Sequence, residues 1–181
     1  MNINDFKLVN LYSKKYFEYI KLSNKKKEIS DINKKRLGFY LLILESVTGN
    51  SDTDELQNAI IDKDYCNIVN EIKNDDYGVD VVYIDEANKK ISLFNFKYKE
   101  TFNETKGGKE APLLSSIKFL TILKNNNFNK VTKLTKEKML EISERLKSDE
   151  IWDIVLYLVS NVNISMPEDS QLINSFKEDF G

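Results

Sequence analysis

Residues 79–99 read VDVVYIDEANKKISLFNFKYK, and this stretch decides how the chain folds. Two segments rich in β-branched and aromatic residues, Val79–Asp85 and Lys90–Lys99, are separated by residues 86–89, none of which is a strong strand former. This pattern predicts two antiparallel strands joined by a short loop.

The pairing of the two strands follows from the alternation of their side chains. If Asp85 pairs with Lys90, then Asp80 lies opposite Asn95, and Lys97 shares their face of the sheet. The opposite face then carries large apolar side chains, namely Val81, Tyr83, Phe94, Phe96 and Tyr98. A shift by one residue would mix the two faces, which favours this register. One face therefore ends in an acid, an amide and a lysine, and a charge buried there is costly unless it is paired or bound to a metal.

Outside the hairpin, apolar spacing and capping residues predict mostly helices. The expected helices span residues 5–22, 31–47, 54–73, 112–124 and 135–146, a turn occupies residues 74–78, and one further buried strand spans Trp152–Ser160. In the second helix, Ser30 or Asp31 is a suitable N-cap and Gly49 a suitable end. The sequence predicts an α/β protein, bordering on α+β, in which a small mixed sheet is flanked by helices.

The composition of the 181 residues limits the chemistry. The chain has no histidine and one cysteine, Cys66, which excludes a Ser-His-Asp triad, a Cys-His pair and a histidine or multi-cysteine metal site. An enzyme of this composition depends on carboxylates, amines and hydroxyls, and carboxylate ligands select a hard cation such as Mg²⁺. The longest apolar run, Phe39–Leu44, is far shorter than the roughly 20 residues of a membrane span. With no visible signal peptide, we expect a cytoplasmic protein with no membrane partner.

Charge is unevenly distributed along the chain, although the net charge is only −2. Residues 44–96 contain four basic and twelve acidic side chains, whereas residues 1–43 and 97–147 are both basic. An acidic block between basic blocks is compatible with a metal site flanked by phosphate-binding lysines. The alternative is the solvated surface of a lysine-rich chain, and composition does not separate the two.

Three segments resemble one protein family. DYGVDVVYID at residues 76–85 and LFNFKY at residues 93–98 resemble the nuclease core of the abortive-infection phage-resistance (AIPR) family, which belongs to the PD-(D/E)XK restriction-endonuclease-like superfamily. LYLVSN at residues 156–161 is similar to the following strand of that core. The pattern of the family is an Asp that opens one strand, then Asp, Glu or Gln, any residue and Lys on the next.

The resemblance implies a division of the chain as well as a fold. Residues 30–160 would form an α-β-β-β-α-β nuclease core. Residues 1–29 would form an N-terminal amphipathic helix and a basic connector. Residues 161–181 would be a polar segment that leads into a downstream region of a longer protein.

The resemblance also implies roles for individual residues. Asp80 matches the metal-binding aspartate, and Lys97 matches the lysine that stabilises the scissile phosphate or activates water. Asn95 occupies the Asp/Glu/Gln position and departs from the pattern, because an amide oxygen can ligate Mg²⁺ but supplies no negative charge. Glu45 matches a helix glutamate that completes many such sites. Independently, Glu45 precedes Gly49 by one turn, where the helix dipole disfavours a carboxylate by about 0.3–1 kcal/mol; a solvated glutamate is the alternative.

The implied activity is metal-dependent hydrolysis of DNA or RNA phosphodiesters in bacterial anti-phage defence. Mg²⁺, or Mn²⁺, would be held by Glu45, Asp80 and Asn95, with Lys97 beside it. Candidate phosphate-binding residues are Lys99, Lys106, Lys109 and Lys118. Further partners would be a second copy or a downstream domain. Two alternatives stay open: a degenerate module that binds nucleic acid or a protein, which Asn95 suggests, and a structural module with an ordinary cross-strand Asp80–Lys97 pair.

Overall fold

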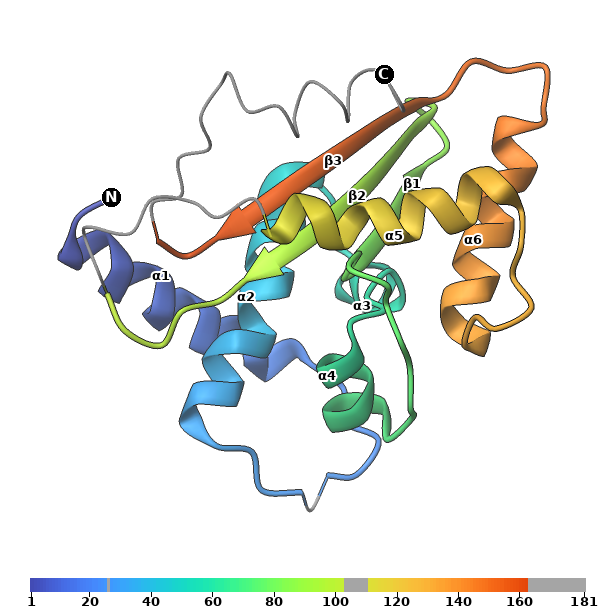
Figure 1. Ribbon diagram of the computed structural model, residues 1–181. Helices are drawn as coiled ribbons and strands as arrows, with labels where there is room; N and C mark the ends of the chain where they lie inside the picture. Colours follow the sequence, from blue (N-terminus) through green and yellow to red (C-terminus); the bar gives the residue numbers. More distant parts are fainter. Residues whose placement is uncertain (26, 103–110, 163–181) are drawn as a thin grey trace.

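The computed structural model describes residues 1–25, 27–102 and 111–162 of the chain. These residues form a three-stranded sheet with helices packed against both of its faces (Figure 1). The buried apolar side chains form two clusters, one on each face of the sheet. The mixed α/β class predicted from the sequence is therefore confirmed. No helix in these three ranges is long and apolar enough to cross a membrane.

The sheet contains β1 (Val81–Asp85), β2 (Lys90–Lys97) and β3 (Asp153–Ser160), in that spatial order. β1 and β2 are antiparallel with Asp85 opposite Lys90, so the predicted register is confirmed. β3 runs parallel to β2 at the edge of the sheet. The described ranges thus contain three strands, whereas the core implied by the resemblance has four.

One face of the sheet is covered by α2 (Asp31–Thr48), which packs in turn against α1 (Ile3–Tyr16). The first helix is shorter than predicted and ends in a single 3₁₀ turn, Phe17–Tyr19. Gly38 allows α1 and α2 to approach closely, because a Cβ at this position would lie 1.8 Å from the carbonyl oxygen of Ser13. This pair of helices and the sheet enclose the first apolar cluster.

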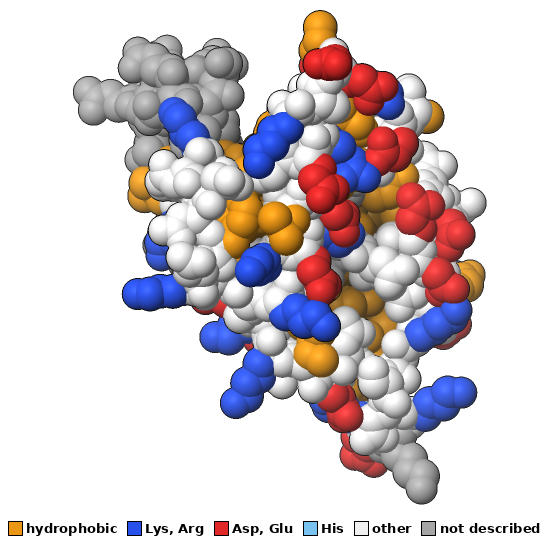
Figure 2. All heavy atoms as spheres, turned by 90° about the vertical axis from the view of Figure 1, so that its right-hand side faces the viewer, with side chains coloured by type: hydrophobic (Ala, Val, Ile, Leu, Met, Phe, Trp, Pro, Cys, Tyr) orange, Lys and Arg blue, Asp and Glu red, His pale blue; other side chains and the backbone are white. Residues whose placement is uncertain are grey.

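The other face is covered by α5 (Ala111–Asn125) and α6 (Lys133–Leu146), which enclose the second cluster with β1 and β2. β3 was expected to be buried, but its side chains are exposed at its start and half-buried beyond because it is an edge strand. On the side of the molecule that carries α6, acidic, basic and hydrophobic side chains are intermixed (Figure 2).

The single helix predicted for residues 54–73 is wrong. The chain instead forms α3 (Thr53–Asn58), a short α4 (Lys63–Tyr65) and a π-helical turn (Cys66–Asn70), and residues 59–62 between α3 and α4 are not helical. Apolar spacing alone did not reveal this interruption.

The interruption joins the sheet. Ile60 forms an isolated antiparallel bridge with Val81 of β1, and the N–H groups of Ile61 and Asp62 both donate to the carbonyl oxygen of Asp80 (2.8 and 2.9 Å). Ile60 and Ile61 are β-branched and completely buried, which favours extended backbone at this point. As a result, Asp62 lies directly beside Asp80.

Candidate metal site

Asp80 lies one residue before β1 and is buried, with 7% of its surface exposed. Its carboxylate accepts a hydrogen bond from the Phe96 N–H on β2. Its own N–H donates to the Phe94 carbonyl oxygen (2.7 Å), which continues the hairpin ladder past the end of β1. Asp80 is therefore held by its backbone and its side chain at once.

A tight turn brings Asp76 beside Asp80. Tyr77 and Gly78 both have positive φ angles, 54° and 86°, and the Val79 N–H donates to the Asp76 carbonyl oxygen (3.1 Å). Two successive left-handed residues reverse the chain in this way. The Asp76 carboxylate also accepts the Gly78 N–H (2.7 Å). The turn predicted at residues 74–78 is confirmed, and it orients an acid towards the start of β1.

The third carboxylate belongs to Asp62, the N-cap of α4. Its Oδ1 accepts the Tyr65 N–H (2.6 Å), while the Lys63 N–H donates to Asp76 (3.0 Å). One oxygen from each of Asp62, Asp76 and Asp80 lies within 4.8 Å of the others. Three carboxylate oxygens at this separation can bind one hard cation.

Burial and mutual repulsion disfavour the ionised form of two of these acids. Burial raises the pKa of Asp62 to about 6, and the charge of Asp76 adds to the shift. Burial, and then the charge of Asp62, raise the pKa of Asp80 well above its usual range, although the Phe96 N–H and the ammonium of Lys97 act against this. A bound cation would offset the same repulsion.

The three carboxylates line a hollow of about 460 Å³ that also has cationic groups on its wall, namely Arg36, Lys63, Lys97 and Lys99. Lys97 is half-buried and forms no ion pair with any residue in the described ranges, so an ordinary Asp80–Lys97 salt bridge is not seen. Arg36 donates through Nη1 to Asp64 (2.8 Å). The hollow thus combines a carboxylate cluster with an unpaired ammonium group.

Asn95 lies beside the site and anchors it. Its Nδ2 donates to the Gly78 carbonyl oxygen (2.7 Å) and to the Ser115 hydroxyl (3.0 Å) of α5. The carbonyl can only accept, which fixes the amide orientation. Asn95 therefore braces, through its amide nitrogen, the turn that carries Asp76.

Glu45 is not brought to this hollow. It lies nine residues after Arg36 on α2, or about two and a half turns, which places the two on opposite sides of the helix. Its carboxylate instead lies against the Tyr16 hydroxyl of α1 and contributes, after burial, to a raised Tyr16 pKa. The helix glutamate implied by the resemblance is therefore separated from Asp80.

The four lysines proposed for phosphate contacts fall into two groups. Lys99 is exposed and lines the hollow, and Lys118 is exposed on α5 one turn after Ser115. Lys106 and Lys109 lie outside the described residues.

Sequence reasoning missed Asp62 and Asp76 as candidate ligands. Asp76 belongs to the quoted stretch 76–85, and its spacing of four residues from Asp80 across a Tyr-Gly turn was an available signal. Asp62 was hidden inside an expected helix, and only the pairing of Ile60 with the sheet brings it to the site.

No protein-family model, no curated protein and no solved structure matches this chain. The case for a function consequently depends on the geometry of the site and on the residues that resemble the AIPR family.

Proposed function

We propose that this chain is a metal-dependent nuclease domain that hydrolyses nucleic-acid phosphodiesters. The observation that carries the proposal is the convergence of Asp62, Asp76, Asp80 and Lys97 in one hollow. Carboxylates for a hard cation beside an ammonium for a phosphate are the two components that metal-assisted phosphodiester hydrolysis requires.

In this proposal Asp62, Asp76 and Asp80 hold Mg²⁺ or Mn²⁺ through carboxylate oxygens. The bound ion supplies a Lewis acid and lowers the pKa of a water molecule. Lys97, free of any ion pair in the described ranges, offsets negative charge that develops on the phosphate. Asn95 keeps the Asp76 turn in place through its bond to Gly78.

The finer assignment, a PD-(D/E)XK-like core of the AIPR family that acts in anti-phage defence, is supported by the resemblance of residues 76–85 and 93–98. The confirmed hairpin register is compatible with it, because Asp80 and Lys97 lie at the same end of β1 and β2. The proposal changes the ligand set from that resemblance: Asp62 and Asp76 replace Glu45 and Asn95.

DNA or RNA is the proposed substrate. Lys99 extends the cationic wall of the hollow and is placed to contact a neighbouring phosphate. The α6 side of the molecule, with its intermixed charges (Figure 2), is not a uniformly basic surface. We therefore expect nucleic acid to approach the hollow and not the α6 side.

The test measures cleavage of single-stranded and duplex DNA and RNA with Mg²⁺, with Mn²⁺ and with a chelator. Asp80→Asn and Lys97→Ala should each lower the rate by about 10²–10³-fold while the fold persists. Asp76→Asn should behave like Asp80→Asn. Glu45→Gln is the matched control, because it removes a carboxylate that the resemblance implicates but that lies outside the hollow, and it should retain wild-type activity.

A protein that binds the cation but cleaves no substrate would contradict hydrolysis and favour the degenerate module that binds nucleic acid or a protein partner. Loss of activity in Glu45→Gln, with Asp76→Asn active, would overturn the ligand set proposed here.

A further inference from the structure

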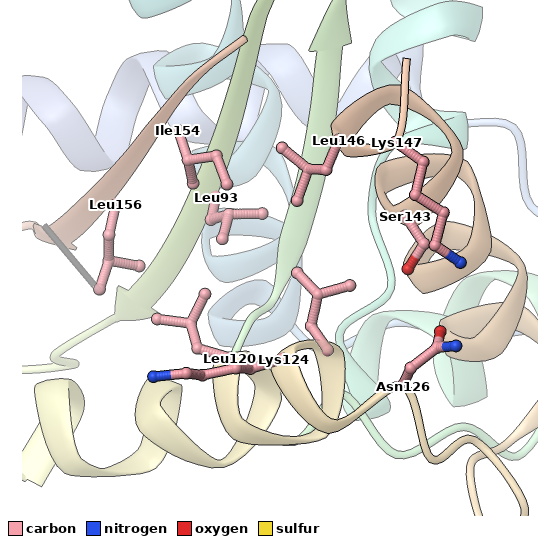
Figure 3. Close-up of a pocket in the computed structure, with 10 residues that line it drawn as sticks. Leu93, Leu120, Lys124, Asn126, Ser143, Leu146, Lys147, Ile154 and Leu156 are labelled. Carbon is pink, nitrogen blue, oxygen red and sulfur yellow. The ribbon is translucent and has the colours of Figure 1, made fainter. Parts of the chain in front are cut away.

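A second hollow lies on the face of the sheet that α5 and α6 cover, between these helices and strands β2 and β3 (Figure 3). Its volume is about 380 Å³, within the range of about 300–1,000 Å³ of small-molecule sites. Aliphatic side chains from all four elements line it: Leu93, Leu120, Leu123, Leu146, Ile154 and Leu156. None of the described residues that line it is acidic or aromatic.

Part of this aliphatic wall is exposed to water. Leu146 of α6 is 45% exposed and Ile154 of β3 is 42% exposed, although both line the same hollow. Exposed aliphatic side chains gathered in a concave surface favour an apolar occupant, which would remove them from water.

The polar groups of the hollow point to the charge of that occupant. Lys124 and Lys147 lie on opposite sides of the aliphatic wall, and Ser143 and Asn126 lie on the same side as Lys147 (Figure 3). Lys147 forms no ion pair with a residue of the described ranges. It follows the last residue of α6, where the helix dipole favours a nearby positive charge. The ammonium group of Lys147, with no carboxylate among the described lining residues, favours an anionic head group.

We propose that this hollow binds a small amphiphile, an unbranched aliphatic chain that ends in a carboxylate. The chain lies against the leucines and Ile154, and the carboxylate is paired with Lys147. A docked peptide helix fits less well, because two turns of helix about 10 Å across would occupy roughly twice this volume. The proposal is independent of the nuclease function, since no residue of the acidic hollow takes part.

The probe is sodium decanoate, titrated below its micelle concentration into the full chain and followed by calorimetry. We expect saturable binding of one molecule per chain. Ile154→Ser should weaken it roughly tenfold, because it removes about two methylene contacts, and Lys147→Glu should weaken it roughly fivefold. Lys136→Glu, on the exposed surface of the same helix and outside the hollow, is the matched control and should bind as the wild type does.

Decyltrimethylammonium, with the same chain and the opposite charge, should bind more weakly than decanoate to the wild type and gain affinity in Lys147→Glu. Equal binding of the two probes, no saturable binding of decanoate, or no effect of Ile154→Ser would overturn the proposal. Self-association of the wild type that Ile154→Ser abolishes would assign this face to a second copy and would also overturn it. Asp80→Asn should bind decanoate normally, which separates this test from that of the nuclease.

Discussion

Asp80 performs two separable tasks with its backbone and its side chain. The carbonyl oxygen accepts two N–H groups from the segment that precedes α4, which ties that segment to the sheet. The carboxylate contributes to the acidic hollow and accepts the Phe96 N–H. Because an amide oxygen can accept the same bond, Asp80→Asn removes the charge and keeps the connections. Substitution by asparagine is therefore the appropriate test at each of the three acids.

Asp62 should make the stability of the metal-free protein depend on pH. Its pKa is about 6 in the folded chain, against about 3.9 when unfolded. Between about pH 4 and 6 the folded state binds a proton that the unfolded state lacks, so the free energy of unfolding should fall as the pH rises through this window. The expected loss is on the order of 2 kcal/mol. Urea unfolding in a chelator at pH 4.5–7.5 measures it.

The Asp62→Asn variant is the control for this pH dependence. It removes the titrating group and keeps an oxygen that can cap α4, so its stability should vary less with pH than that of the wild type. Equal pH profiles for the two proteins would contradict the assigned role of Asp62.

Asn95→Asp should destabilise the fold and not strengthen cation binding. The substitution places a carboxylate oxygen against the Gly78 carbonyl oxygen, where Nδ2 now donates. An unsatisfied buried acceptor costs about 1–3 kcal/mol. Thermal melts with and without Mg²⁺ measure both effects. Asn129→Asp, at an exposed position between α5 and α6, is the matched control. A variant that gains more stability from Mg²⁺ than the wild type does would restore Asn95 as a ligand position.

At the scale of the elements, the hairpin could be predicted because its alternation separates two chemically distinct faces. The observed register puts Val81 and Phe94 together in the core, and a shift by one residue would mix the faces. The break between α3 and α4 could not be predicted in this way, since Ile60 and Ile61 satisfy a helical apolar pattern as well as an extended one. Their true neighbours are on β1, a contact between distant parts of the chain.

The candidate site could be predicted only where its residues belong to the hairpin. Asp80 and Lys97 follow from the hairpin, which is a local structure. The position of Glu45 depends on which side of α2 faces the sheet. The apolar run at residues 39–44 surrounds the helix and therefore does not define how α2 is rotated about its axis. In the structure Arg36 and Tyr40 face the acidic hollow, and Glu45 points towards α1.

The contact of α1 with α2 should be highly sensitive to a single added methyl group. In Gly38→Ala the new Cβ would lie 1.8 Å from the Ser13 carbonyl oxygen, so α1 must move. We expect a loss of about 3 kcal/mol or more in the free energy of unfolding. Gly49→Ala is the control: nothing lies within 4 Å of its Cβ, and only the left-handed backbone (φ 70°) costs about 1–2 kcal/mol. A smaller loss in Gly38→Ala than in Gly49→Ala would contradict this packing.

At the scale of the whole molecule, the acidic hollow lies where the two apolar clusters meet. Val79 belongs to the cluster under α5 and α6, whereas Val81 belongs to the cluster under α2, and Asp80 stands between them. Tyr40 of α2 and Ser115 of α5 both line the hollow. A ligand bound there contacts both halves of the molecule. Its binding should therefore raise the free energy of global unfolding.

A divalent cation should therefore stabilise the entire fold. An ion at a hundred times its Kd adds about 2.7 kcal/mol, and for a chain of this size each kcal/mol raises Tm by about 2–4 °C. We expect Mg²⁺ or Mn²⁺ to raise the wild-type Tm by several degrees in one cooperative transition, measured by calorimetry. Asp76→Asn should lose this rise, because it removes one of three converging carboxylates, while Glu45→Gln should retain it. The same rise in Asp76→Asn as in the wild type would place the bound cation elsewhere and remove the basis of the proposed nuclease site.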